Sequence, residues 1–140
     1  MSQQQTQRKS LEQVVDEYGR FPIEAFEFVR HGLSFTVQQV HGDVEGKPES
    51  ICHISGKQLC EGLRDFAVQR YGVMARAVLA HWGVHRTMDF GRIVFAMVDS
   101  KLMHKTDQDD IRDFEGVFDF ERAFQPPKRP RAESRAVFQL

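Results

Sequence analysis

The sequence has 140 residues, of which 41% are hydrophobic and 28% charged, a composition typical of one soluble globular domain. Nineteen basic and twenty acidic residues give a net charge of −1, which excludes a protein that holds nucleic acid by an overall positive field. No apolar run approaches the roughly 18 residues of a membrane span, the polar N-terminus lacks an apolar signal sequence, and two cysteines are too few for a disulfide framework. We therefore expect a cytoplasmic protein with one compact domain.

The first forty residues predict two helices behind a disordered arm. Residues 1–10 are polar and rich in Gln, without apolar periodicity, so we expect no ordered structure there. A longer helix is predicted at residues 23–41, with Phe28 and Phe35 on a second apolar face beside its main stripe. That second face is either covered by another element of the chain, such as the preceding short helix, or left for a partner. The preceding helix is predicted at residues 11–18 by four apolar residues at helical spacing: Leu11, Val14, Val15 and Tyr18.

The centre of the chain predicts three helices, which we expect to form the core. A loop at residues 42–50 and a short apolar strand at residues 51–54 come before them. Ser55 and Gln58 have the spacing of a capping box, which predicts a helix that begins here and ends at Gly72. Apolar residues at helical spacing continue in two further predicted helices, at residues 74–82 and 87–102. Three amphipathic helices so close in sequence can bury their apolar faces on one another.

The C-terminal part predicts a β-hairpin and a tail. Residues 103–106 and 114–120 are expected to be its strands, since Phe114, Phe118 and Phe120 alternate with polar residues, and residues 107–110 its turn. Residues 125–140 are rich in proline and basic residues, which predicts a disordered basic tail. The predicted fold class is therefore mainly α with a small C-terminal β-hairpin (α+β), a winged-helix-like helical bundle. Residues 11–124 would form the single domain.

Three segments resemble an uncharacterised family of small bacterial proteins. They are YGRFPIEAFEFVRHGLSFTV, HISGKQLCEGLRDFAVQRYGVMARAVLAHWGV and TMDFGRIVFAMVDSKLMHKTDQDDIRDFEGVFDFERAF. The likeness covers roughly residues 18–124, and the stretches SGKQLCEGLR and DFGRIVF carry most of it. That family has no assigned activity, so the resemblance implies one shared fold and transfers no catalytic or binding residue.

Charge is unevenly distributed along the chain. Residues 55–86 have a net charge of +3, the predicted hairpin at residues 103–121 has −5, and the tail after Pro126 has +3. Such charges are either scattered over a solvated surface or favour oriented association with a partner or another copy. The candidate interaction surface consists of the following residues: Arg64, Arg70, Arg76, Arg86, Asp107, Asp109, Asp110, Asp113, Lys128, Arg129 and Arg131.

The residues that bear reactive or metal-binding groups do not form a known motif. Cys52 and Cys60 are separated by seven residues, which is too many for a zinc knuckle, and Gly83 interrupts the helix that would align His81 with His85. We therefore expect no metal, no cofactor, and two thiols that pack as small apolar groups. The chain contains no nucleotide-binding or hydrolase motif.

These observations predict a non-enzymatic adaptor that binds a protein partner or itself. The alternative is a nucleic-acid-associated factor that grips RNA or DNA through the basic helical face and the basic tail, with the acidic hairpin pointing away. An acidic wing would be repelled by a phosphate backbone, which favours the first interpretation.

Overall fold

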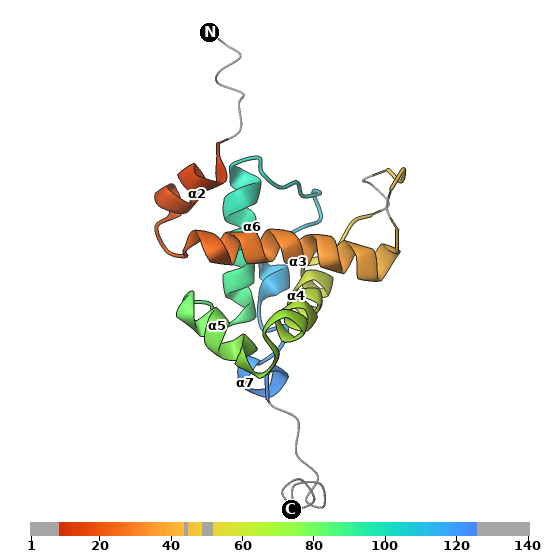
Figure 1. The fold of residues 1–140 in the computed structure, drawn as a ribbon. Coiled ribbons are helices and arrows are strands. Elements are labelled where there is room, and N and C mark those ends of the chain that lie inside the picture. The colour runs from red at the N-terminus through yellow and green to blue at the C-terminus, as the bar shows by residue number, and fades with distance from the viewer. Residues whose placement is uncertain (1–8, 44, 49–51, 126–140) are drawn as a thin grey trace, which may run out of the picture.

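The computed structural model describes residues 9–43, 45–48 and 52–125, which form an all-helical bundle (Figure 1). The helices predicted at residues 11–18 and 23–41 are confirmed. No helix in the described ranges combines the length and the apolar character that crossing a bilayer requires. The elements are α2 (Leu11–Tyr18), α3 (Ile23–His41), α4 (Gly56–Tyr71), the 3-10 helix η2 (Gly72–Met74), α5 (Ala75–His81), α6 (Thr87–Asp99), the 3-10 helix η3 (Ile111–Phe114) and α7 (Phe120–Ala123).

Helices α2 and α4 begin with reciprocal capping boxes of Ser and Gln. The Gln58 backbone N–H donates to Ser55 Oγ at 3.1 Å, and the Ser55 backbone N–H donates to Gln58 Oε1 at 3.0 Å, as the sequence predicts. Ser10 and Gln13 form the same pair at the start of α2. Ser10 is therefore ordered, although the predicted disordered arm includes it. The rest of that arm, apart from Lys9, lies outside the described residues, as does the predicted tail beyond Gln125.

The predicted C-terminal β-hairpin is wrong, and with it the α+β class and the winged-helix architecture. The described residues contain no strand, including residues 103–106 and 114–120. Asp110 and Asp119 cap two short helical turns, η3 and α7, which carry Phe114 and Phe120 into the core. Gly116 has a φ of 61° between those turns and reverses the chain. Separate helical turns bury Phe114 and Phe120, and Phe118 is half-buried between these turns, so the three rings do not line one face of a strand.

The central elements also begin or end at residues other than those predicted. Residues 52–54 are not a strand, and residue 51 lies outside the described part of the chain. The second central helix is divided into η2 and α5, and Met74 is 57% exposed instead of facing the core. The third ends at Asp99, because Lys101 adopts a φ of 64° and the Leu102 backbone N–H donates to the Met97 carbonyl oxygen at 2.8 Å.

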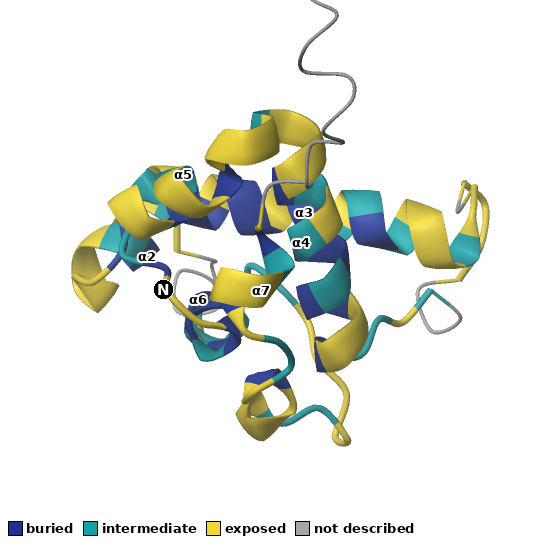
Figure 2. Cartoon of the chain, turned by 90° about the horizontal axis from the view of Figure 1, so that it is seen from below, coloured by how far each residue is buried: buried dark blue, intermediate teal, exposed yellow. Residues whose placement is uncertain are grey.

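The core forms where α3 crosses α4 and α6 (Figure 1). Phe28 of α3 is 4% exposed, and its ring centroid lies 5.3 Å from that of Phe66 and 5.6 Å from that of Trp82. Phe35 packs on Phe66 as well, at 5.2 Å. The second apolar face of α3 is therefore covered from within the chain, but by α4 and α5 rather than by α2. Figure 2 shows the buried residues on the sides of α3, α4 and α6 that face one another.

Glycines let α3 and α4 approach closely. A methyl group at Gly62 would collide with the side chain of Thr36, and one at Gly32 would collide with Leu63. Thr36 is buried, and its hydroxyl donates to the Gly32 carbonyl oxygen at 2.7 Å. The crossing therefore requires small residues at these two positions.

Phe114 of η3 is held between two other glycines. A Cβ atom on Gly56 would lie 3.1 Å from the Phe114 ring, and one on Gly91 would lie 2.8 Å from the Phe114 Cβ atom. The buried Thr87 hydroxyl donates to the Phe114 carbonyl oxygen at 2.6 Å and accepts from the Val117 backbone N–H at 3.2 Å. These contacts fasten the C-terminal segment to α4 and α6.

Asp89 is a buried carboxylate at the start of α6, with 1% of its surface exposed. Its Oδ2 atom accepts from the backbone N–H groups of His85 and Arg86 at 2.9 and 3.3 Å, and its Oδ1 atom lies 2.7 Å from Arg92 Nη1. Arg20 approaches the same oxygen at 3.7 Å. Asp89 therefore caps α6 and joins it to the turn between α2 and α3.

Candidate functional site

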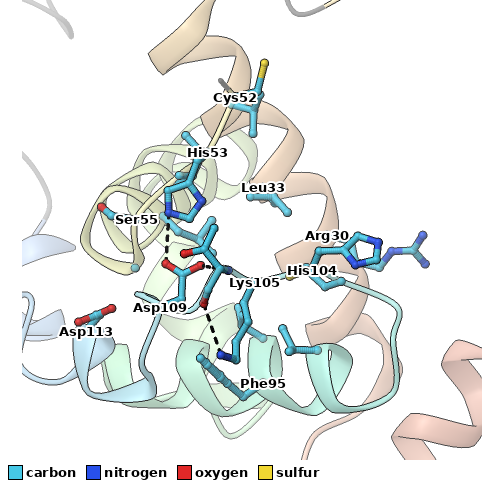
Figure 3. A pocket seen from close by; sticks show the side chains of 18 of the residues that line it. Arg30, Leu33, Cys52, His53, Ser55, Phe95, His104, Lys105, Asp109 and Asp113 are labelled. Carbon is cyan, nitrogen blue, oxygen red and sulfur yellow. Dashed lines mark hydrogen bonds and ion pairs between the residues drawn. The ribbon is translucent and has the colours of Figure 1, made fainter. Parts of the chain in front are cut away.

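An open pocket of about 900 Å³ lies between the middle of α3, the start of α4 and the second half of α6 (Figure 3). Residues 52–54 and 102–106 complete its walls together with Lys47, Asp109, Asp113 and Phe114. Ligand pockets in proteins commonly have volumes of roughly 300–1,000 Å³. The pocket is therefore large enough for a small molecule or for a few side chains of another protein.

Apolar side chains from three helices make up most of the pocket wall. Leu33 and Val37 lie one turn apart on α3, and Val94 and Val98 one turn apart on α6, so each pair faces the same side of its helix. Leu59 of α4 adds to this surface. Covering apolar surface stabilises a complex by about 25 cal/mol per Å² removed from water.

Three cationic side chains stand around the apolar wall. Arg30 comes from α3, while Lys47 and Lys105 come from loops. Lys47 Nζ donates to the His41 carbonyl oxygen at 3.1 Å, and Lys105 Nζ lies 3.4 Å from the Thr106 carbonyl oxygen. None of the three forms an ion pair with a residue that the structure describes. Their charges are therefore available to an anionic group.

A histidine and an aspartate tie the loops of the pocket together. His53 Nε2 lies 3.2 Å from Asp109 Oδ1, as Figure 3 shows, and Asp109 Oδ2 accepts from the Thr106 backbone N–H at 2.8 Å. His41 Nε2 lies 2.8 Å from the His53 carbonyl oxygen and connects the same loop to the end of α3. These polar groups hold the wall of the pocket in place.

Ser55, His53 and Asp109 all line the pocket, but they do not form a catalytic triad in the described residues. The Ser55 hydroxyl accepts from the Gln58 backbone N–H as the cap of α4 and makes no hydrogen bond with His53. A serine nucleophile needs a base within hydrogen-bond reach. The chemistry that the pocket offers is apolar contact together with positive charge.

The basic residues predicted to form an interaction face are divided among three elements. Arg64 and Arg70 both lie on α4, but they are six positions apart, which places them about 120° apart around the helix axis. Arg64 Nε lies 3.1 Å from Asp65 Oδ1. Arg76 lies on α5, and Arg86 is the N-cap residue of α6. The four arginines do not gather on one helix face.

The four predicted acidic residues lie close together, and most have a local structural role. Asp110 Oδ1 accepts from the Arg112 backbone N–H at 2.8 Å, and Asp113 Oδ2 accepts from the Asp110 backbone N–H at 3.1 Å, so the two cap η3. Hydrogen bonds from Arg112 lower the pKa of Asp110 to about 2. Asp109 binds His53 as described above, and Asp107 is exposed.

Lys128, Arg129 and Arg131, the predicted basic residues of the tail, lie outside the described residues.

The cysteines and histidines considered for a metal lie in separate places. Cys60 is buried in the core, where burial and the nearby charge of Glu61 raise the pKa of its thiol to about 12. Cys52 lines the pocket, whereas His81 and His85 are exposed at and beyond the end of α5. In the described ranges, no three His, Cys, Asp or Glu side chains come close enough to hold a metal ion.

Sequence reasoning missed the cationic residues of the pocket. Arg30 and Lys47 are 17 positions apart and Lys47 and Lys105 are 58 positions apart, so the three cations do not form a charge run. Leu33 and Val37 belong to the main apolar stripe of the helix predicted at residues 23–41. The apolar wall of the pocket could therefore be detected from the sequence, whereas its cationic residues could not.

Comparisons with protein-family models, with curated proteins and with solved structures found no match for this chain.

Proposed function

We propose that the protein is a non-enzymatic, cytoplasmic interaction module that binds a short segment of a partner protein in the pocket between α3, α4 and α6. One observation carries this proposal: an apolar wall is surrounded by three cations without ion-pair partners among the described residues. A fitting segment would place apolar side chains against Leu33, Val94 and Val98. Its Asp or Glu residues would meet the cations.

The chemistry of the pocket favours a peptide over nucleic acid. Wall residues such as Val37 and Leu59 bury aliphatic or aromatic side chains well but offer no hydrogen-bond groups to base edges. Nucleic-acid binding is therefore the competing outcome of the experiment.

Selection from a displayed library of random peptides would test the proposal. We expect the enriched peptides to combine apolar residues with Asp or Glu, and to bind the purified protein in fluorescence polarisation. The double variant Lys47→Glu/Lys105→Glu should weaken their binding about tenfold or more, since rim charges of opposite sign would then repel the peptide.

The matched control is Arg122→Glu, which changes an exposed cation on α7 that does not line the pocket. This variant should bind the selected peptides like the unchanged protein. Peptides that bind the pocket variant with unchanged affinity would contradict the proposal. A gel shift of RNA or DNA by the unchanged protein, lost in the pocket variant, would support the nucleic-acid alternative instead.

A further inference from the structure

Large apolar side chains are exposed at the junction of α4 and α5. Val68 is 47% exposed, Val73 73% and Met74 57%. Arg70 and Arg76 lie in the same short stretch and are exposed too. We name these five residues the α4–α5 corner. Apolar side chains exposed together in this way are typical of a surface that contacts another molecule.

The charge of the corner determines what can cover it. Residues 68–76 contain two arginines and no acidic residue. The Arg70 guanidinium lies 5.6 Å from the centroid of the Phe66 ring, and neither Arg70 nor Arg76 has an ion-pair partner among the described residues. Two corners placed face to face would repel each other. The covering surface must therefore be acidic and partly apolar.

The same chain carries such a surface at residues 107–115, which we name the acidic loop. Its five carboxylates and one arginine give a net charge of −4. Ile111 is 36% exposed in the middle of the loop. Asp107, Asp113 and Glu115 form no ion pair with any described residue. The acidic loop thus matches the corner in both apolar character and charge.

The corner and the acidic loop lie at opposite ends of α4. The corner is at its C-terminus, whereas a Cβ atom on Gly56, the first residue of α4, would lie 2.8 Å from the Asp113 Cβ atom. A helix of 16 residues is about 24 Å long. One chain cannot bring its own corner to its own loop, so a contact between these surfaces joins two copies.

We propose that copies of this chain associate head to tail, with the α4–α5 corner of one copy on the acidic loop of the next. Such a contact uses the corner of one copy and the acidic loop of the other. The first copy then still has a free acidic loop and the second a free corner, so further copies can add to form a ring or an open chain. Three apolar side chains and two cations make a small interface, and we expect a dissociation constant of roughly 0.1 mM. This proposal does not depend on a ligand in the pocket.

Analytical ultracentrifugation of the full chain would measure the association. Over a range from about 10 µM to 1 mM protein, which brackets the expected dissociation constant, the mean mass should rise with concentration. Raising the salt from about 0.05 M to 0.5 M should weaken the association several-fold, because salt screens exposed charges.

Two surface variants test whether the corner binds the acidic loop of another copy rather than a second corner, and whether the loop binds a corner rather than a second loop. Val73→Ser/Met74→Ser alters only the corner, and Asp107→Asn/Ile111→Ser alters only the loop. The second variant spares Asp109, Asp110 and Asp113, whose hydrogen bonds hold the loop in shape. Each variant alone should remain a monomer. An equimolar mixture should form one-to-one dimers and nothing larger, because each variant supplies the surface that the other lacks.

Three results would overturn the proposal. The first is a monomer at every concentration of the unchanged protein, and the second is a mixture of the two variants that does not dimerise. The third is binding of the protein to phosphatidylglycerol vesicles through the corner while the protein stays monomeric. That result would mean that the corner contacts a lipid surface. The pocket variant Lys47→Glu/Lys105→Glu should still associate, so failure of the pocket proposal and failure of this one are distinguishable.

Discussion

The thiol groups of Cys52 and Cys60 lie in two different environments. Cys60 has no exposed surface, and its pKa of about 12 means that the thiolate form is nearly absent near neutral pH. Cys52 is partly exposed beside the pocket. Because the thiolate is the reactive species, burial should make Cys60 inert. Cys60 then acts as a small apolar core residue, as the sequence predicts.

We expect a thiol reagent to label the native protein once, at Cys52. Labelling of Cys60 should require unfolding and should stay slow up to about pH 9, since its thiol titrates well above that value. Mass spectrometry of the native and the urea-unfolded protein would count the labels. The control Cys52→Ser should show no rapid labelling. Rapid labelling of Cys60 in that variant would contradict the buried position.

At the scale of the elements, the C-terminal segment is held by side chains of the helices that it covers. Thr87 satisfies two backbone groups of this segment with one hydroxyl, the carbonyl oxygen of Phe114 and the N–H of Val117. The hydroxyl is buried, so water cannot replace it without structural change. A side chain 27 residues earlier in the sequence therefore helps to fix the position of η3, together with the packing of Phe114 between Gly56 and Gly91.

Replacing Thr87 by Val should lower the free energy of unfolding by about 1–3 kcal/mol, because the shape is kept while the buried Phe114 carbonyl and the half-buried Val117 N–H lose their partner. Urea unfolding followed by circular dichroism would measure the change. The variant Thr87→Ser keeps the hydroxyl and should lower the free energy of unfolding clearly less. Equal losses for the two variants would mean that the methyl group, and not the hydrogen bonds, stabilises this junction.

At the scale of the whole molecule, local signals in the sequence were sufficient for the helices and insufficient for the C-terminal segment. The helices at residues 11–18 and 23–41 and the Ser55 cap follow from spacing and capping within a few residues. The alternation of Phe114, Phe118 and Phe120 has the period of a strand. Here the capping residues Asp110 and Asp119 form helical turns instead, and contacts with distant helices decide the outcome.

The pocket could not be predicted for a related reason. Its walls come from α3, α4, α6 and two loops, and the His53–Asp109 contact joins residues 56 positions apart. Periodicity shows which face of a helix is apolar, but it does not show where a neighbouring helix stops covering that face. Of the predicted arginines, Arg70 and Arg76 share the α4–α5 corner, whereas Arg64 and Arg86 lie elsewhere.

The core includes the C-terminal segment, so shortening the chain should have a sharply position-dependent effect. A chain that ends at Gln125 keeps the buried Phe114, Phe120 and Phe124, and should unfold cooperatively on heating at nearly the temperature of the full chain. A chain that ends at Asp110 exposes the surfaces that these rings cover. It should lose its near-ultraviolet circular dichroism and bind a hydrophobic dye. A folded, cooperative chain ending at Asp110 would contradict this description of the core.

The Phe114 side chain packs between Gly56 and Gly91, so the residue types allowed at these three positions depend on one another, although the positions are far apart along the chain. Alanine at either glycine leaves no room for the ring, and a smaller residue at position 114 leaves a void between two bare helix backbones. Natural variants of this fold should therefore exchange these residues as a set, passing through an unstable intermediate whichever position changes first. A bulky ring at 114 paired with glycine at 56 and 91 would then identify distant relatives when overall similarity has faded.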